Sequence, residues 1–241
     1  MSFSTIAEFY DRINGSAYKP YADFVENAFS KSKVPVKEVL DLGCGTGGIC
    51  ALLADKGFDM IGLDISTDML MLAREKNFEK NTLLLCQDMR SFVLYGTVQA
   101  AYSSFDCLNY ITTHKDLCKV FVLLHNYIEP GGIFVFDVNT EYRYENILDG
   151  RSYVYEIDED MAIWRSAYDS ETKTCNFDID IFAETGKNKY SRTGETQVQK
   201  FHSEEDVIAA AAGFELVEKS GGKGFDGCSE EEKLYYVFRR I

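Results

Sequence analysis

The stretch VLDLGCGTGG, residues 39–48, determines how the rest of the sequence is interpreted. An apolar run containing the carboxylate Asp41 passes into glycines spaced as G-x-G-x-x-G, at Gly43, Gly45 and Gly48. Glycines between a strand and a helix let the backbone turn sharply and approach a ligand closely. The segment therefore predicts a nucleotide-type ligand at the carboxyl end of a parallel strand.

Apolar runs and amphipathic segments alternate along most of the chain. This alternation is typical of a parallel sheet with helices on both faces, because each helix returns the chain for the next parallel strand. We therefore predict an α/β fold, a doubly wound and mostly parallel sheet. The expected strands cover 36–42, 60–63, 82–86, 99–104, 133–136, 215–219 and 234–239. The expected helices cover 3–14, 18–31, 48–56, 115–128 and 203–212, with one more beginning at the capping residue Ser66.

The pattern changes between residues 152 and 201, where apolar and polar side chains alternate, as Phe177 and Ile179 do with Asp178. A period of two is that of a half-buried strand, so we predict a small antiparallel sheet inserted into the α/β domain. The insertion would span 141–202, and residues 1–140 and 203–241 would form the main domain. We expect the insertion to cover a substrate pocket or to make a homodimer contact.

Charge and cysteine content narrow the classes of partner. The net charge is −14 at pH 7, whereas tight binding to nucleic acid or an anionic membrane needs an excess of Lys and Arg, so we expect neither partner. The 7 cysteines form no Cys-x-x-Cys pair, and none stands near a His in a zinc spacing. We therefore expect no metal, and reduced thiols in a cytoplasmic protein. The sequence has no secretion-signal pattern, and no apolar run approaches the ~20 residues of a membrane span.

The charge around the glycines indicates which ligand binds there. A dinucleotide would place an anionic pyrophosphate against the loop. Asp41 would oppose that group, and no Lys or Arg occurs between Lys37 and Lys56. S-adenosylmethionine carries a sulfonium and an ammonium but no phosphate, so it suits the loop better than NAD does. An NAD-dependent oxidoreductase stays the alternative.

Two further carboxylates follow expected strands. Asp64 ends the second strand, where it can accept hydrogen bonds from both ribose hydroxyls of a nucleotide. Asp88 ends the third strand beside Met89, where an acceptor next to an apolar side chain suits the amino edge of an adenine. Either residue alone could be a helix cap, but three carboxylates on successive strand ends favour one binding site.

The chain at this point resembles the class I S-adenosylmethionine-dependent methyltransferases. The resemblance rests on DLGCGTGG (41–48), IGLDIS (61–66), CQDM (86–89) and EPGGIFVFDV (129–138), and returns at AAGFELVE (211–218). It implies a seven-stranded sheet with a reversed last strand. It also implies that Gly43 and Gly45 approach the methionine part of the cofactor, Asp64 its ribose, and Asp88 with Met89 its adenine.

The N-terminal EFYDRI (8–13) resembles the lid helices of small-molecule enzymes in this class. The resemblance implies that Tyr10 can reach the carboxylate end of the cofactor. The predicted cofactor site comprises Tyr10, Tyr18, Asp41, Gly43, Cys44, Gly45, Asp64, Ile65, Met69, Gln87, Asp88, Met89 and Ser104.

The segment SSFDCLNYITTH (103–114) follows the fourth strand, where the resemblance places the methyl acceptor. It contains no proline, which argues against enzymes that methylate DNA adenine through an Asn/Asp-Pro-Pro-aromatic sequence. Asn109, Tyr110 and His114 are the predicted catalytic candidates near the methyl group, although Tyr110 suits a packing role equally well. The insertion holds 8 basic and 13 acidic side chains, a balance that favours a neutral or cationic acceptor.

We therefore predict an enzyme that transfers a methyl group from S-adenosylmethionine to nitrogen or oxygen of a small molecule by in-line displacement. Methyl transfer needs mainly alignment of donor and acceptor, so the absence of an evident general base is compatible with catalysis. A protein that binds S-adenosylmethionine without catalysis is a further alternative.

Overall fold

A computed structural model describes residues 6–187, 189–222 and 227–241. Seven strands form one sheet in the order β10-β11-β5-β4-β1-β2-β3, and only β11 runs against the others. This arrangement confirms the predicted fold class and the reversed last strand. The strands are β1 (Glu38–Leu42), β2 (Asp59–Asp64), β3 (Thr82–Cys86), β4 (Val98–Ser103), β5 (Ile128–Asn139), β10 (Phe214–Gly221) and β11 (Lys233–Arg240).

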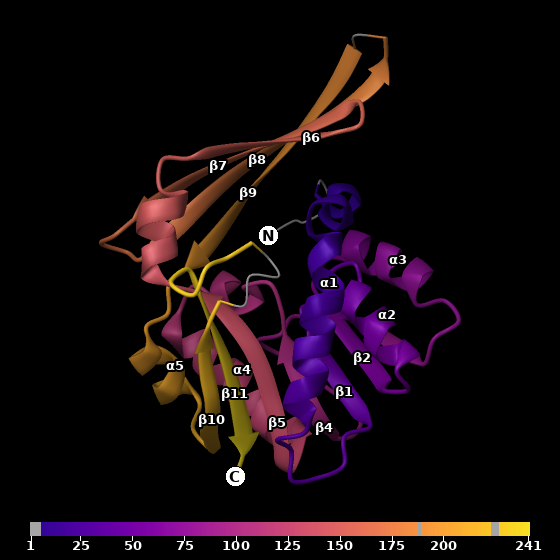
Figure 1. Cartoon of the computed structure of the whole chain (residues 1–241), viewed down its shortest axis with the longest axis vertical. Coiled ribbons are helices and arrows are strands. Elements are labelled where there is room, and N and C mark those ends of the chain that lie inside the picture. The colour runs from indigo at the N-terminus through magenta and orange to yellow at the C-terminus, as the bar shows by residue number, and fades with distance from the viewer. Residues whose placement is uncertain (1–5, 188, 223–226) are drawn as a thin grey trace.

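Helices cover both faces of this sheet (Figure 1). One face packs against α1 (Ala7–Phe29) and α2 (Gly48–Asp55), and the other against α4 (His114–Tyr127) and α5 (Glu204–Ala210). Between β2 and β3 lies α3 (Thr67–Lys76). Ser66 caps α3 and Ser203 caps α5 through a capping box, as the sequence predicts.

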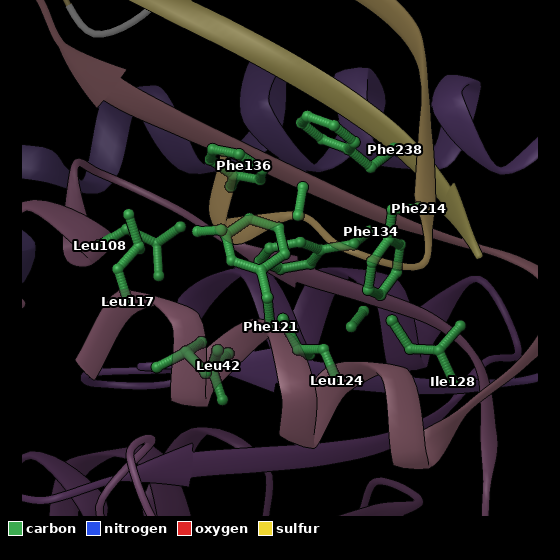
Figure 2. Packing of buried hydrophobic residues seen from close by; sticks show 14 of the residues in the cluster. Leu42, Leu108, Leu117, Phe121, Leu124, Ile128, Phe134, Phe136, Phe214 and Phe238 are labelled. Atoms are coloured by element: carbon green, nitrogen blue, oxygen red, sulfur yellow. The ribbon is translucent and has the colours of Figure 1, made fainter. Parts of the chain in front are cut away.

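Phe121 of α4 is the centre of the core on the α4 face (Figure 2). Its ring centroid lies 5.7 Å from that of Phe134 and 5.9 Å from that of Phe136, both with edge-to-face geometry. Phe214 and Phe238 pack around the same ring. Aromatic contacts of this kind fix β5, β10 and β11 against α4.

Four antiparallel strands in sequential order form the inserted sheet, and they confirm the predicted period-2 reading. They are β6 (Ser152–Ile157), β7 (Asp160–Asp169), β8 (Thr174–Gly186) and β9 (Lys189–Lys200). A π-helical segment, η2 (Arg143–Leu148), leads into them from β5. The inserted sheet lies across one end of the large sheet, next to the start of α1 (Figure 1). Its apolar face, with Phe177 and Ile179, packs in one cluster with Ile6 and Phe9.

The N-terminal helix differs from the prediction. The sequence predicts two helices with a break at Gly15, whereas α1 is continuous; residues 3–5 of the first predicted helix lie outside the described residues. Glycine within a helix costs about 1 kcal/mol relative to alanine. Ala17, Tyr21 and Val25 are buried against the sheet beyond that point, and packing of this face outweighs the local preference. The predicted break was therefore wrong.

Strand β5 begins at Ile128, before the predicted start at residue 133. Ile128 pairs with Val98, and the register then shifts through the Pro-Gly-Gly sequence. A Cβ on Gly132 would lie 2.4 Å from the Gln99 carbonyl oxygen, so glycine permits the close approach of β4 and β5. The helix before this sequence ends at Tyr127, close to the predicted end at residue 128, but the glycines lie within a strand irregularity and not in a loop.

Candidate active site

The glycine loop between β1 and α2 adopts backbone conformations that favour glycine. The φ angles are +87° at Gly43, +52° at Gly45 and +72° at Gly47. A Cβ on Gly43 would lie 2.2 Å from Cys107 Sγ and 3.4 Å from the end of Met89. Glycine is therefore needed at position 43 both for the positive φ angle and because Cys107 and Met89 leave no room for a side chain.

Asp64 at the end of β2 holds this loop in place. Its Oδ2 accepts the Gly45 backbone N–H at 2.8 Å, and its Oδ1 accepts the Ser66 backbone N–H at 2.8 Å. Burial raises the pKa of this carboxyl, whereas the backbone donors oppose the rise. A carboxylate with backbone support on both oxygens is a rigid acceptor for further donors.

Replacement of Asp64 tests its predicted contact with the ribose. We expect Asp64→Ala to lower the affinity for S-adenosylhomocysteine at least about tenfold without unfolding the protein, because hydrogen bonds to a charged group contribute about 1.5–3 kcal/mol each. Calorimetry measures the affinity. Asp59→Ala, at the opposite end of the same strand, is the matched control. An unchanged dissociation constant in Asp64→Ala would reassign this residue to loop support alone.

Asp41 lies beneath the loop. Its Oδ2 accepts the Tyr102 hydroxyl at 2.6 Å and the Cys50 thiol at 3.3 Å. Burial raises its pKa to about 7, although both donors oppose the rise. Asp41 is 1% exposed, so its carboxyl is buried and does not face the open side of the loop.

Two predicted residues, Asp88 and Met89, follow the end of β3, and they make different contacts. Met89 lies against the glycine loop at Gly43. Asp88 pairs with Arg90, whose Nε lies 2.9 Å from Oδ1, and this pairing lowers the pKa of the carboxyl. The Gln87 amide instead closes the turn after β3, because it bonds the Val93 backbone at both of its ends.

Four other predicted cofactor contacts lie around the same strand ends. Cys44 packs in the core of the α1 face, and Met69 packs in the cluster beneath the inserted sheet. Ser104 is buried just after β4, whereas Ile65 is 47% exposed beside Asp64. Of the four, Ile65 is the apolar side chain that is open to a bound group.

Tyr18 fastens α1 to the glycine loop. A Cβ on Gly48 would lie 2.3 Å from its ring, and its hydroxyl donates to Asp11 Oδ1 at 2.7 Å. Thr46 of the loop also donates to Asp11. Asp11 and Thr46 are not among the predicted contacts, although Asp11 stands within the EFYDRI segment (8–13).

The residues present fit S-adenosylmethionine. The loop offers backbone without side-chain bulk, Asp64 offers a supported acceptor, and Met89 with Ile65 offers apolar contact. When bound, the cofactor would meet Gly43 and Gly45 on its methionine side and Asp64 at its ribose.

A cavity of about 330 Å³ lies between the large sheet and the inserted sheet. Elements far apart in the sequence contribute to its walls: α1, the turn after β4, the end of β5, η2, one or two residues of each strand from β6 to β9, and the segment that leads into β11. The lining residues used below are Tyr10, Asp106, Tyr110, Arg143, Tyr153, Tyr155, Trp164, Gln199, Glu232 and Lys233.

Tyr10 connects this cavity with the glycine loop. Its ring lies 3.9 Å from the position of a Cβ on Gly45, and the same side chain lines the cavity. Burial raises its pKa well above the usual value, and the neighbouring Tyr18, Tyr110 and Asp106 add to the rise. The hydroxyl therefore stays protonated and available as a donor.

Asp106 is a carboxylate outside the predicted site residues. It stands in the turn shortly after β4, and it lines the cavity. Phe105 and Asp106 both have positive φ angles, +54° and +51°, which cost about 1–3 kcal/mol each in non-glycine residues. Such a turn persists when its surroundings hold it, and here it aims a carboxylate into the cavity.

The three predicted catalytic residues do not come together. Tyr110 lines the cavity, and its hydroxyl donates to Gln197 Oε1 at 2.7 Å. The Asn109 amide instead bonds the Lys200 carbonyl and the Asn139 N–H, so it ties the turn to β9 and β5. His114 begins α4 at the surface and does not line the cavity.

Comparison with known proteins identifies the family. A methyltransferase-domain family matches residues 39–132. A protein of Bacillus subtilis (strain 168) that is named as a methyltransferase, YqeM, is 32% identical to this chain over 222 residues. The match covers 90% of this chain and 87% of that protein. A dTDP-3-amino-3,4,6-trideoxy-alpha-D-glucopyranose N,N-dimethyltransferase of Streptomyces venezuelae is 28% identical over 134 residues, 54% of this chain and 56% of that enzyme. The crystal structure of a S-adenosylmethionine-dependent methyltransferase from Clostridium acetobutylicum ATCC 824 has a TM-score of 0.85 at 24% identity, over 99% and 98% of the two chains.

This chain therefore belongs to the class I S-adenosylmethionine-dependent methyltransferases. The matches decide in favour of S-adenosylmethionine over NAD, the alternative that the glycine pattern left open. Within the described ranges, no helix is long and apolar enough to cross a membrane. Over those same ranges, no three His, Cys, Asp or Glu side chains gather as a metal site.

Proposed function

We propose that the enzyme methylates a small-molecule amine that binds between the inserted sheet and the glycine loop. One observation carries this proposal: Tyr10 of α1 both lines the cavity and lies next to the glycine loop, and Asp106 lies on the cavity wall. A concave site of this size, with aromatic walls and a few polar groups, is typical of small-molecule binding. Its place at the carboxyl ends of the strands brings an acceptor next to the predicted cofactor site.

The charges around the cavity favour a neutral or cationic acceptor. Among the described lining residues, Lys233 faces Asp106 and Arg143 faces Glu232, so the basic side chains are compensated. The buried Asp137 adds a further carboxyl behind Lys233. A carboxylate has more lone pairs than Asp106 uses in its protein contacts, so it can also accept an N–H from an amine.

The aromatic walls support the same class of acceptor. Tyr153, Tyr155 and Trp164 of the inserted sheet line the cavity together with Tyr10. Aromatic faces attract cationic amines, and they also pack against the apolar faces of rings. The Streptomyces venezuelae relative bears the name of an amino-sugar N,N-dimethyltransferase. We therefore propose an amine on a polar ring, with a hydroxyl acceptor as the second candidate.

The protein's part in the reaction is alignment and exclusion of water. When bound, S-adenosylmethionine would supply an activated methyl group, since its sulfur leaves as a neutral thioether when a nucleophile attacks the methyl carbon. The amine reacts in its neutral form, so an acceptor that binds as an ammonium first loses a proton to solvent. Asp106 accepts an N–H of the neutral amine and so orients the nitrogen lone pair toward the glycine loop. Tyr10 and the inserted sheet cover the site. A closed site fixes the approach of the acceptor and strengthens its electrostatic contacts.

The relative's name specifies a nucleotide-linked sugar, but the charge balance of this cavity argues against a phosphate-bearing acceptor here. Phosphate recognition typically uses arginine or lysine as charge partners. The basic side chains among the described lining residues already face carboxylates. We therefore propose that the acceptor amine carries no phosphate.

Methyl transfer to matched sets of small molecules tests the proposal. Each set contains one ring with an amine, hydroxyl or carboxylate at the same position, and the amine is also offered as a phosphate ester. We expect turnover of the free amine to exceed that of every other member at least about tenfold. Asp106 repels the negative charge of the carboxylate and the phosphate ester, and a neutral hydroxyl oxygen is a weaker nucleophile than an amine nitrogen. Preference for the hydroxyl or the phosphate ester would contradict the proposal. Tight cofactor binding with no turnover of any member would favour a non-catalytic binding protein.

A further inference from the structure

Gln199 reaches from the inserted sheet to the carboxylate on the cavity wall. It lies on β9, it is buried, and its Nε2 donates to Asp106 Oδ2 at 2.6 Å. These two residues are far apart in the sequence: Gln199 lies on the inserted sheet and Asp106 in the turn after β4 of the main domain. The hydrogen bond therefore connects the inserted sheet directly with Asp106 of the main domain.

The direction of the Gln199 amide is fixed by its other neighbours. Its Oε1 accepts the Tyr144 hydroxyl at 2.9 Å and the Asn139 side-chain N–H at 3.3 Å. With two donors on the oxygen, the NH₂ group must face the carboxylate. An amide held on both sides can hold Asp106 in turn.

The main domain supports Asp106 from the opposite side. Lys233 Nζ lies 3.0 Å from Asp106 Oδ1 and 2.9 Å from Asp137 Oδ2. The Asp106 backbone N–H also donates to Asp137 at 2.8 Å. The carboxylate thus has one oxygen held by the main domain and the other by the insertion.

We propose that Gln199 is a positioning residue that sets the orientation of Asp106. Methyl transfer then depends on the inserted sheet being packed against the main domain. This inference rests on the proposed function, because Asp106 is the group that we assign to the acceptor. A displaced inserted sheet leaves one carboxylate oxygen without its donor, and the carboxylate then loses its fixed direction.

Four variants of the full-length protein test this role: Q199E, D106N, D106N/Q199E and N176D. Q199E keeps the size of the side chain but replaces the donor facing Asp106 with a carboxylate oxygen. D106N/Q199E exchanges the amide and the carboxylate between the two positions, so a hydrogen bond can form again. N176D makes an amide-to-carboxylate change on an exposed face of the same sheet and is the matched control.

Kinetics with the best amine of the panel are combined with S-adenosylhomocysteine binding and thermal unfolding. We expect Q199E to lower kcat/KM at least about thirtyfold while the S-adenosylhomocysteine affinity stays within about threefold, and N176D to change neither. D106N/Q199E should regain most of the thermal stability lost in Q199E, but it should not regain turnover relative to D106N. In the D106N background, Q199E should lower turnover less than about threefold further.

The alternatives give different results. Parental kcat/KM in Q199E, or effects of Q199E and D106N that multiply, would overturn the positioning role while the proposed function stands. A parallel loss of cofactor affinity and turnover in Q199E would indicate a merely structural role and would also overturn it. A parent enzyme that methylates no amine of the panel overturns the proposed function and this inference with it.

Discussion

Removal of the inserted sheet should abolish methyl transfer while S-adenosylhomocysteine still binds. We expect replacement of residues 152–200 by an eight-residue Gly/Ser linker to lower turnover at least about a thousandfold, because the acceptor loses its aromatic wall and Asp106 loses Gln199. The first and fourth strands lie about 14 Å apart across the sheet, and a linker of this length spans the gap even with a lengthwise offset. The glycine loop, Asp64 and Asp88 remain in the truncated protein.

Calorimetry and turnover on the same preparation test this division of labour. We expect cofactor affinity to change less than about tenfold, since the start of α1 loses packing but Tyr18 keeps its contacts with Asp11 and Gly48. Full activity in a folded truncated protein would make the insertion a decoration or an oligomer contact. Loss of cofactor binding in the folded protein would show that the two regions do not divide the work as proposed.

Lys233→Met should destabilise the fold more than any exposed charge removal. Lys233 is 2% exposed and its ammonium lies between Asp106 and Asp137. Removing one partner of a buried ion pair costs about 3–5 kcal/mol, because the remaining charge stays buried without compensation. Chemical denaturation measures the change. Lys56→Met is the matched control, since Lys56 also bonds two carboxylates but in a solvent-accessible position, where the expected cost is about 0–1 kcal/mol.

The destabilisation by Lys233→Met should also depend on pH. Burial raises the pKa of Asp137, and Lys233 opposes that rise, so the variant should raise it further. When the pKa of a carboxyl is higher in the folded than in the unfolded state, its contribution to the free energy of unfolding is lost as pH rises through the pKa of the folded state. The gap in unfolding free energy between variant and parent should therefore be larger at about pH 8 than at about pH 5. A gap that is independent of pH, or equal to that of Lys56→Met, would contradict the buried-pair account.

The sequence predicted those features that depend on local pattern. The mostly parallel sheet follows from the alternating elements, its reversed last strand from the resemblance, and the inserted sheet from its period of two. The positions of Asp64 and Met89 at strand ends also follow, because parallel strands bring their carboxyl ends to one edge. The break at Gly15 failed because long-range burial of α1 outweighs a local helix preference.

The acceptor side could not be predicted in the same way, because its residues meet only through tertiary contacts. Asp106, Gln199 and Lys233 come from three distant segments, and no spacing connects them. Asp106 has one local signal: it stands in the turn shortly after β4, as Asp64 stands at the end of β2. His114 stood in the right segment, but α4 carries it to the surface.

A structure of the protein with S-adenosylhomocysteine and its best amine substrate tests the central claim most directly. We predict that the acceptor lies in the cavity beneath the inserted sheet, with its nitrogen about 3 Å from an Asp106 carboxylate oxygen and directed at the sulfur across the gap that the methyl group fills. An acceptor bound outside this cavity, or one whose nitrogen faces away from Asp106 and the glycine loop, would contradict the account.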